Sequence, residues 1–239
     1  MLGIISLGGI CHDTRSLRRI IPRDYYAVAA DSGLAHFRLL GIKTDMLVGD
    51  MDSISTDDLA RYKKENLPIE LFDSRKNSTD SEIALDKAVS NGCDSFLFIG
   101  AFGNRLDHML SNQMMAVSIA MSGKPVILTD GITFFHTISQ YNSPFKYEIT
   151  NLVNNVDVIS VIPVIGDAVD VTIEGLEYKL DKETILFGST RAVSNTIPVI
   201  ETMDAVYATI MIESGMIFFI HTKSDEFLKE KCDEYSTKT

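Results

Sequence analysis

The chain has 239 residues, of which 45% are hydrophobic and 23% are charged, which is an ordinary composition for one large globular domain or two small ones. Its formal net charge of −11 argues against a general nucleic-acid-binding protein, because such proteins carry a basic patch or stripe. The widely spaced Cys11, Cys93 and Cys232 fit neither a disulfide framework nor a zinc motif. With no apolar stretch of membrane-spanning length and no signal-peptide pattern, we expect a cytoplasmic protein with free thiols and no membrane or nucleic-acid partner.

Strand-like and helix-like segments alternate through the first half of the chain. This alternation predicts an α/β domain, residues 1–130, with a mainly parallel sheet and helices on both faces. The expected strands are residues 3–7, 26–30, 46–48, 68–72, 95–99 and 125–128. The expected helices are residues 34–40, 55–65, a segment that starts at 78–82 and stops at 91–92, and 106–121.

The pattern changes after about residue 130, where strand-like segments follow one another with glycines between them. Successive short strands with turn signals predict an antiparallel sandwich or barrel, here over residues 131–225. Residues 226–239 read as a charged tail. The expected strands are residues 132–138, 156–164, 169–173, 184–187, 197–201, 205–212 and 216–221.

Residues 49–53 (Gly-Asp-Met-Asp-Ser) follow the apolar run 46–48 directly. Parallel α/β sheets bind ligands at the carboxyl ends of their strands, and paired carboxylates suit Mg²⁺ together with substrate phosphates. Asp50 and Asp52 are therefore candidate metal ligands. The alternative is a turn with a helix cap, since Asp and Ser favour both.

Similar polar clusters follow other expected strands, at residues 31–33, 76–80 and 100–108. Because parallel strands end at one edge of a sheet, Asp80 can converge with Asp50 and Asp52. The glycines at 100 and 103, and the helix that begins near Arg105, would favour a phosphate. Each of these motifs can also be explained without a ligand: Thr79 could simply cap its helix, and Arg105 and Asp107 could form an exposed ion pair. Neither a Walker A motif nor Gly-x-Gly-x-x-Gly occurs.

The order of these motifs resembles the thiamine pyrophosphokinase family. That family carries an Asp-Gly-Gly-Ala-like loop, Gly-Asp-Phe-Asp-Ser, Lys-Asp-x-Thr-Asp and Gly-x-x-Gly-x-Arg-x-Asp-His, in this order. Residues 174–180 and 187–195 look like two later motifs of the family, Gly-Leu-Lys-Trp-x-Leu and Gly…Ser-x-Asn. The resemblance thus runs from about residue 28 to residue 196.

The resemblance implies a Rossmann-like catalytic domain followed by an all-β sandwich that binds thiamine. It also implies a homodimer with active sites at the subunit interface, and the conversion of ATP and thiamine to AMP and thiamine diphosphate with Mg²⁺. By position, the metal ligands are Asp50, Asp52 and Asp80; the nucleotide and phosphate contacts are Asp31, Gly33, Lys76, Thr79, Gly103, Arg105 and Asp107; and the thiamine contacts are Tyr178, Ser194 and Asn195.

Several positions depart from the family pattern without removing a charge that the chemistry needs. Ser32 and Leu34 replace Gly and Ala in the first loop, Asn77 stands for Asp, and Asn104 replaces a frequent Gly. The chain has no Trp, so stacking on the thiamine rings falls to Tyr178.

The implied reaction is in-line attack of the thiamine hydroxyl on the β-phosphorus of ATP, with Mg²⁺ and Arg105 offsetting the charge that develops towards AMP. Asp107 or Asp80 is the candidate acceptor of the hydroxyl proton. Two rival hypotheses keep the scaffold: a Mg²⁺-dependent nucleotide hydrolase or diphosphotransferase with another acceptor, and a non-catalytic thiamine or nucleotide sensor.

Overall fold

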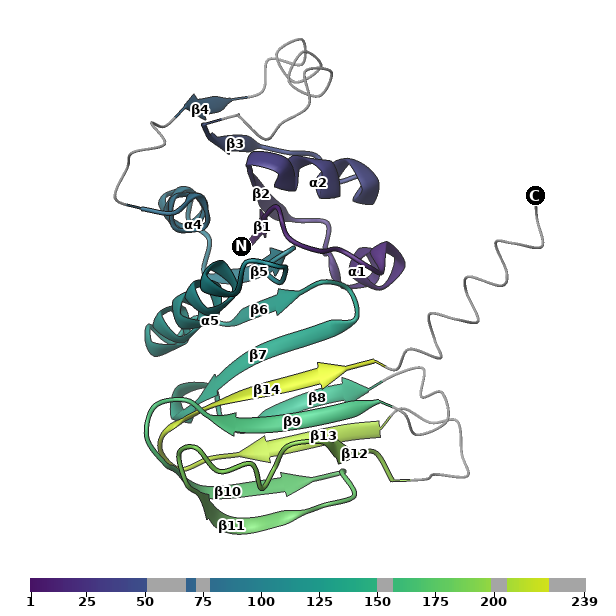
Figure 1. The fold of residues 1–239 in the computed structure, drawn as a ribbon, viewed down its shortest axis with the longest axis vertical. Coiled ribbons are helices and arrows are strands. Elements are labelled where there is room, and N and C mark those ends of the chain that lie inside the picture. The colour runs from purple at the N-terminus through teal and green to yellow at the C-terminus, as the bar shows by residue number, and fades with distance from the viewer. Residues whose placement is uncertain (51–67, 72–77, 150–156, 199–205, 224–239) are drawn as a thin grey trace, which may run out of the picture. The chain divides into compact units, whose positions relative to one another are not determined.

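The computed structural model describes residues 1–50, 68–71, 78–149, 157–198 and 206–223 (Figure 1). The chain divides into two compact units, Met1–Gly131 and Ile132–Thr239. Within the described ranges, no helix is long and apolar enough to cross a membrane. The expected helix at 55–65 lies outside the described residues.

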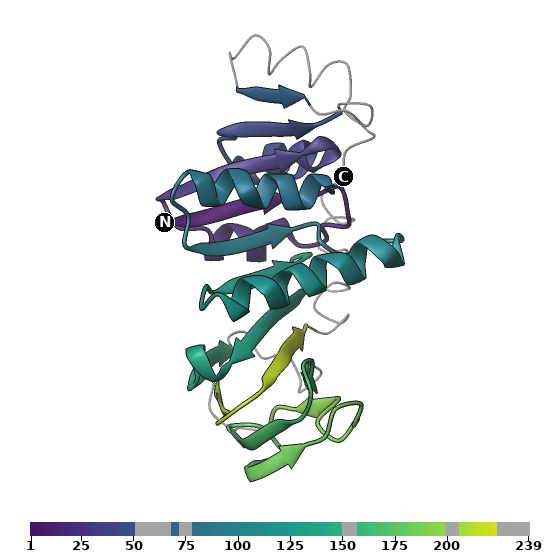
Figure 2. The same ribbon diagram turned by 90° about the vertical axis from the view of Figure 1, so that its left-hand side faces the viewer.

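The first unit contains a parallel sheet with the described strand order β6-β5-β1-β2-β3-β4. Helices α4 and α5 cover one face, and α1 and α2 cover the other (Figures 1 and 2). The fold class predicted from the alternation is confirmed. The strands are β1 (Leu2–Ser6), β2 (Tyr25–Ala30), β3 (Met46–Gly49), β4 (Ile69–Leu71), β5 (Ser95–Ile99) and β6 (Val126–Thr129). The helices are α1 (Thr14–Ile20), α2 (Leu34–Leu40), α4 (Asp80–Ser90) and α5 (Leu106–Met121), and the 3₁₀ turn η1 is Asp31–Gly33.

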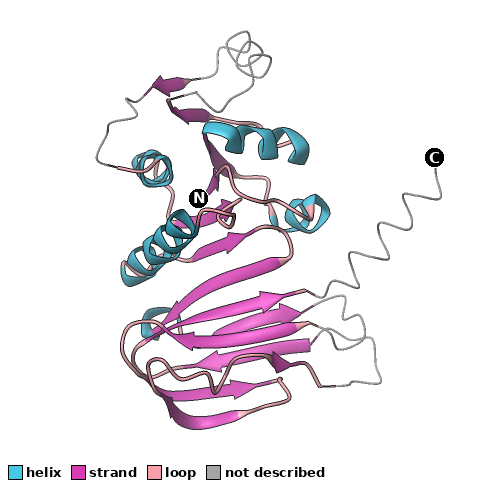
Figure 3. Ribbon diagram, viewed as in Figure 1, coloured by secondary structure: helices cyan, strands magenta, loops and turns pink. Residues whose placement is uncertain are grey.

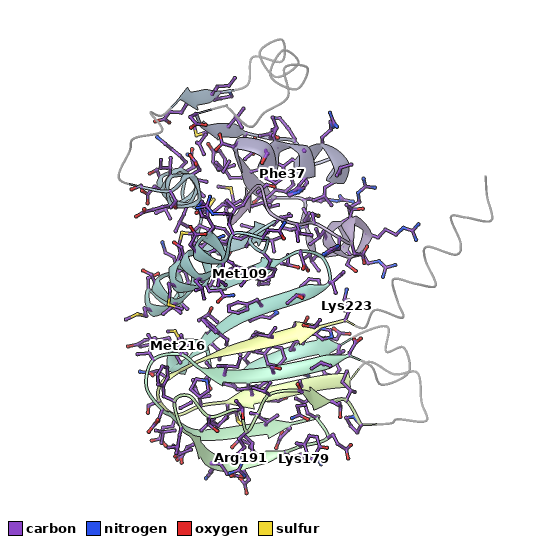
Figure 4. The ribbon with its side chains drawn as sticks, viewed as in Figure 1. Phe37, Met109, Lys179, Arg191, Met216 and Lys223 are labelled. Atoms are coloured by element: carbon purple, nitrogen blue, oxygen red, sulfur yellow. The ribbon has the colours of Figure 1, made fainter. Side chains whose placement is uncertain are left out.

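The core on the α1 and α2 face follows from helical and strand periodicity. Leu34, Phe37 and Leu40 recur at intervals of three along α2 and are buried against the sheet; Phe37 is labelled in Figure 4. The helix ends at Gly41, whose φ of 67° is the left-handed conformation that suits glycine. Helix α1 was not predicted, because only Ser16 and Leu17 are buried in it and its arginines mask the apolar period.

The register of the strands places several loops side by side. Ser6, the last residue of β1, pairs with Ala29 of β2 and with Ile99 of β5. Successive strands extend from β1 to β4 in one direction, and the chain then returns to place β5 and β6 on the other side of β1. The strand order therefore reverses at β1, which is where open α/β sheets bind ligands.

The second unit is an antiparallel β-sandwich in its described part, and Figure 3 shows strands as its main elements. One set of paired strands has the order β12-β9-β14-β7, and the other has the order β11-β10-β13-β8. The strands are β7 (Thr133–Ser139), β8 (Phe145–Ile149), β9 (Val158–Pro163), β10 (Ala168–Glu174), β11 (Leu180–Ile185), β12 (Asn195–Thr196), β13 (Val206–Met211) and β14 (Met216–Thr222), with a 3₁₀ turn η2 at Gln140–Asn142.

Three strands of this unit differ from the prediction. Strand β12 occupies Asn195–Thr196, whereas residues 197–198, the described part of the strand expected at 197–201, are not in a strand. Strand β8 was missed, although Phe145, Tyr147 and Ile149 alternate with Lys146 and Glu148 as in a half-buried strand. Strand β11 was expected at 184–187 but occupies Leu180–Ile185. It lies at the end of its sheet and turns only its first and last residues fully into the core, so the intervening polar side chains hide the apolar signal.

Candidate active site

A pocket of about 790 Å³ opens at the carboxyl ends of the parallel strands in the first unit. Loops that follow β1, β2, β3 and β5 form its wall, together with the first turns of α4 and α5. It therefore lies where the strand order reverses. The described lining comprises residues 7–10, 30–32, 50, 79–81, 100–105, 108, 109 and 112.

The carboxylates of Asp31, Asp50 and Asp80 all belong to residues that line this pocket, although they come from three separate loops. Asp31 has a φ of 46°, which is rare for a residue with a side chain. Its carboxylate occupies the space that a Cβ at Gly49 would need. A side chain at Gly49 would have to displace this carboxylate, and the φ of 136° at Gly49 strains any residue other than glycine. Asp31 is thus held against the end of β3, immediately before Asp50.

The donor set of these carboxylates fits a hard divalent cation, because Mg²⁺ prefers carboxylate oxygens and retains water and phosphate ligands. Within the ranges that the structure describes, however, no three acidic, histidine or cysteine side chains are grouped closely enough to hold a metal ion. Two other predicted site residues, Asp52 and Lys76, lie outside the described residues.

The loops after β1 and β5 are packed backbone to backbone. The N–H of Gly9 donates to the carbonyl of Gly100 at 3.0 Å, and the N–H of Ile10 donates to the carbonyl of Phe102 at 2.7 Å. A Cβ at Gly9 would collide with both carbonyls. Asn112 of α5 is buried and donates to the carbonyl of Ala101 at 3.1 Å. These contacts give the glycine-rich loop at 100–103 a defined conformation beside the pocket.

The start of α5 carries a cationic group at the rim. Arg105 lines the pocket and makes a two-point ion pair with Asp107, from Nε to Oδ1 at 2.9 Å and from Nη2 to Oδ2 at 2.6 Å. Both side chains are mostly exposed. The Arg105 hydrogen bonds hold the pKa of Asp107 well below its usual range. Asp107 is not among the described residues that line the pocket.

At the start of α4, Thr79 acts as the helix cap that its residue type suggests. Its Oγ1 accepts a hydrogen bond from the N–H of Glu82 at 3.3 Å and lies 3.0 Å from the Ser81 hydroxyl. Thr79, Asp80 and Ser81 nevertheless all line the pocket. The positive end of the α4 dipole thus faces the same space and favours an anion there.

Some lining residues were not predicted, and Gly33, like Asp107, is a predicted residue that lies outside the described lining. Gly8 and Gly9 line the pocket, and their position directly after the first expected strand is a signal that identifies them. Met109, labelled in Figure 4, and Asn112 also line it from α5. Gly33 is not among the described lining residues; it packs against the carbonyl of Ser6, where a Cβ has no room.

The predicted thiamine contacts lie together in the second unit. Asn195 is only 4% exposed. Its Oδ1 accepts from the N–H groups of Tyr178 at 3.0 Å and Thr196 at 2.9 Å, and its Nδ2 donates to the carbonyl of Tyr178 at 2.8 Å. Tyr178 is 67% exposed. Ser194 is also exposed, has a φ of 61°, and its N–H donates to Ser160 Oγ at 3.1 Å. The amide of Asn195 therefore holds the backbone of Tyr178.

Comparisons with known proteins agree in both units. The family model described as "Thiamin pyrophosphokinase, catalytic domain" matches residues 17–128, and that described as "Thiamin pyrophosphokinase, vitamin B1 binding domain" matches residues 146–217. The thiamine pyrophosphokinase of Bacillus subtilis (strain 168) is 28% identical over 170 residues, which are 71% of this chain and 77% of that protein.

Solved structures with the same names share the fold. The crystal structure of thiamine pyrophosphokinase from Bacillus subtilis has a TM-score of 0.77 and 24% identity, and the match covers 93% of this chain and 99% of that one. The enzyme from Geobacillus thermodenitrificans has a TM-score of 0.73 and 24% identity, with 94% and 98% covered. Thiamin pyrophosphokinase from Candida albicans has a TM-score of 0.66 at 14% identity, with 93% and 90% covered.

Proposed function

This chain belongs to the thiamine pyrophosphokinase family, and we propose that it transfers the diphosphoryl group of ATP to the hydroxyl of thiamine. The observation that carries this proposal is the pocket at the strand ends, because its lining combines acidic side chains, a glycine-rich loop and an arginine. That combination suits the binding of a nucleotide together with its divalent cation.

We assign the nucleotide to the first unit. The starts of α4 and α5 and the loop at 100–103 would face the phosphates, and Arg105 would bind a phosphate oxygen through its planar guanidinium. Asp50 and Asp80, with Asp52, would hold Mg²⁺, which when bound neutralises phosphate charge. Asp31, which follows β2 and whose carboxylate lies against Gly49 at the end of β3, would support this set.

In the proposed reaction, the thiamine oxygen forms a bond to the β-phosphorus of ATP. The bond from that phosphorus to the oxygen shared with the α-phosphate breaks, and AMP leaves with the electron pair. Two carboxylates are candidate acceptors of the hydroxyl proton. The hydrogen bonds from Arg105 lower the pKa of Asp107, which disfavours proton uptake there. Asp80 is the carboxylate of the two that lines the pocket.

We assign thiamine to the second unit, with Tyr178 as the aromatic surface for its rings and Ser194 as a polar contact. The high exposure of both side chains supports this assignment. We further propose a homodimer that completes the active site across its interface. Leu186 and Phe187, which are 60% and 62% exposed in the second unit, supply apolar surface for such an interface.

The test is an assay of the purified protein with Mg-ATP and thiamine that measures thiamine diphosphate and AMP. We expect equal amounts of both products and no AMP without thiamine. AMP release in the absence of thiamine would instead identify a nucleotide hydrolase. Binding of both substrates without either product would identify a sensor, and sedimentation of the active protein as a monomer would contradict the dimer.

A further inference from the structure

Behind the pocket, Ser6 and His36 connect the loops that follow β1, β2 and β5. Ser6 is fully buried at the end of β1, and its hydroxyl donates to the carbonyl of Gly33 at 2.7 Å. The same Oγ lies 3.4 Å from Nδ1 of His36 on α2. The carbonyl of Leu7 faces the His36 ring as a further acceptor and partly offsets the lowering of its pKa by burial. His36 is not among the described residues that line the pocket, whereas Leu7 is.

The glycine-rich loop at 100–103 packs against the ring of His36. Gly100 has a φ of 71°, and a Cβ there would lie 2.8 Å from Cε1 and 3.0 Å from Nδ1 of the His36 ring. The ring is therefore packed directly against the Gly100 backbone. Because the carbonyl of Gly100 also accepts the N–H of Gly9 at 3.0 Å, a shift of the ring would displace both loops that border the pocket.

The hydrogen bonds also indicate which nitrogen of the His36 ring carries the proton. A serine hydroxyl has a single proton, and that of Ser6 points to the carbonyl of Gly33. Ser6 Oγ therefore accepts at its contact with His36, so that Nδ1 carries the ring proton. Burial lowers the pKa of His36, which agrees with a neutral ring in this place.

We propose that His36, supported by Ser6, is a positioning residue that sets the conformation of the nucleotide-binding loops at 7–10 and 100–103. This inference rests on the proposed function, since it takes the pocket to bind the phosphates of ATP. His36 touches neither substrate. It acts through Gly100 and Leu7, and a displacement of about 1 Å at such a loop is enough to change rates and affinities greatly.

The experiment compares His36→Leu, which removes the ring nitrogens, with His36→Asn, whose amide places a donor near the position of Nδ1. We expect His36→Leu to raise the KM for ATP, and the Kd for a non-hydrolysable Mg-ATP analogue, about tenfold while the KM for thiamine stays unchanged. His36→Asn should recover affinity to within about threefold of the wild type. Ser6→Ala should change the same two constants in the same direction by a smaller factor. His12→Leu is the matched control, because His12 is an exposed histidine outside the described lining.

The outcomes separate this inference from the proposed function. A wild-type protein that does not bind the ATP analogue contradicts the proposed function itself. If the wild type binds it and His36→Leu binds equally well, His36 has no positioning role. Equal losses for ATP and thiamine, together with a lower unfolding midpoint in both His36 variants, would show a purely structural role and overturn the proposal. Nitrogen-15 NMR of the folded wild type should show the ring proton on Nδ1, and a proton on Nε2 alone would contradict the Ser6 contact.

Discussion

The pocket of the first unit and the core of the second unit both contain carboxylate and imidazole groups, but in very different surroundings. Asp50, Asp80 and His108 line an open space. In the second unit, Asp157 and His221 are almost fully buried, with side chains that are 8% and 3% exposed. Burial of such groups requires partners inside the protein. The contrast separates polar residues that are available to a ligand from those that hold the fold.

The buried group in the second unit is a chain of hydrogen bonds between strands. Asp157, just before β9, lies 2.9 Å from Nε2 of His221 on β14. Nδ1 of His221 lies 3.1 Å from the Tyr147 hydroxyl on β8. Because β14 and β8 belong to different sets of paired strands, this chain ties the two layers of the sandwich together. Burial raises the pKa of Tyr147, so its hydroxyl stays protonated.

The largest effect that the comparison predicts is loss of activity at the pocket without loss of stability. Asp50→Asn keeps the shape of the side chain but removes a charge that the proposed metal site needs. We expect kcat to fall by at least about 100-fold, with an unchanged unfolding midpoint. Product formation and thermal unfolding are measured on the same preparation. Asp86→Asn, at an exposed position of α4, is the control and should keep full activity. Near-normal turnover of Asp50→Asn would remove Asp50 from the site.

The second prediction concerns Asn195, where the sequence motif and the structure assign different roles. Asn195→Ala leaves two N–H groups and the carbonyl of Tyr178 without their buried partner. We expect it to lower the free energy of unfolding by about 2–3 kcal/mol, as measured by urea denaturation. Ser194→Ala, at the exposed neighbouring position, should leave stability unchanged and raise only the KM for thiamine. If Asn195→Ala is fully stable and only weakens thiamine binding, then Asn195 is a direct ligand.

Asn195 also shows how far sequence reasoning extends. The motifs locate Tyr178, Ser194 and Asn195 as a group, and the structure confirms that they are neighbours. The motifs do not predict that the side-chain amide of Asn195 is hydrogen-bonded to backbone groups, because those bonds depend on the pairing of β12 with β9. Whether these residues bind thiamine stays a prediction.

In the first unit too, the sequence pattern predicts the fold and the acidic residues of the site, but not the contacts that depend on tertiary packing. Alternating periodicities predict the parallel sheet, and parallel strands place Asp31, Asp50 and Asp80 at one edge. The role proposed for His36 and Ser6 was not predicted from the sequence, because neither residue belongs to a polar cluster after a strand. The proposal rests on their contacts with Gly100 and Gly33. Such contacts join residues that lie 27 to 64 positions apart in the sequence, and local propensity contains no information on them.

The third prediction is acid instability that arises in the second unit. His136 is packed among the rings of Phe145, Tyr147 and Phe219, and its Nε2 has no hydrogen-bond partner within the described part of the chain. Burial, with a smaller contribution from His221, lowers its pKa from 6.5 to about 3. The unfolded chain therefore binds this proton first as the pH falls. Its contribution to stability is complete above pH 6.5 and declines by up to about 1.4 kcal/mol per pH unit as the pH falls towards 3.

Urea denaturation at several pH values measures this slope. His136→Phe should flatten it, because the replacement keeps an aromatic ring in the cluster but binds no proton. His12→Gln, at an exposed histidine, should leave the slope as in the wild type. A wild-type slope in His136→Phe would assign the acid sensitivity to other groups.

The smallest effect is expected at the exposed Arg105–Asp107 ion pair. Both hydrogen bonds of this pair are present, but we expect the pair to contribute little to the stability of the fold. Solvent screens an exposed ion pair, so Arg105→Lys and Asp107→Asn should both leave the unfolding midpoint unchanged. Lysine cannot reproduce the two-point contact of the guanidinium, and we expect Arg105→Lys to raise the KM for ATP roughly fivefold. Asp107→Asn removes the competitor for the guanidinium and should leave the KM for ATP equal or lower. A lower midpoint in either variant would show that this pair stabilises α5, and a higher KM in Asp107→Asn would show that Asp107 itself contributes to nucleotide binding.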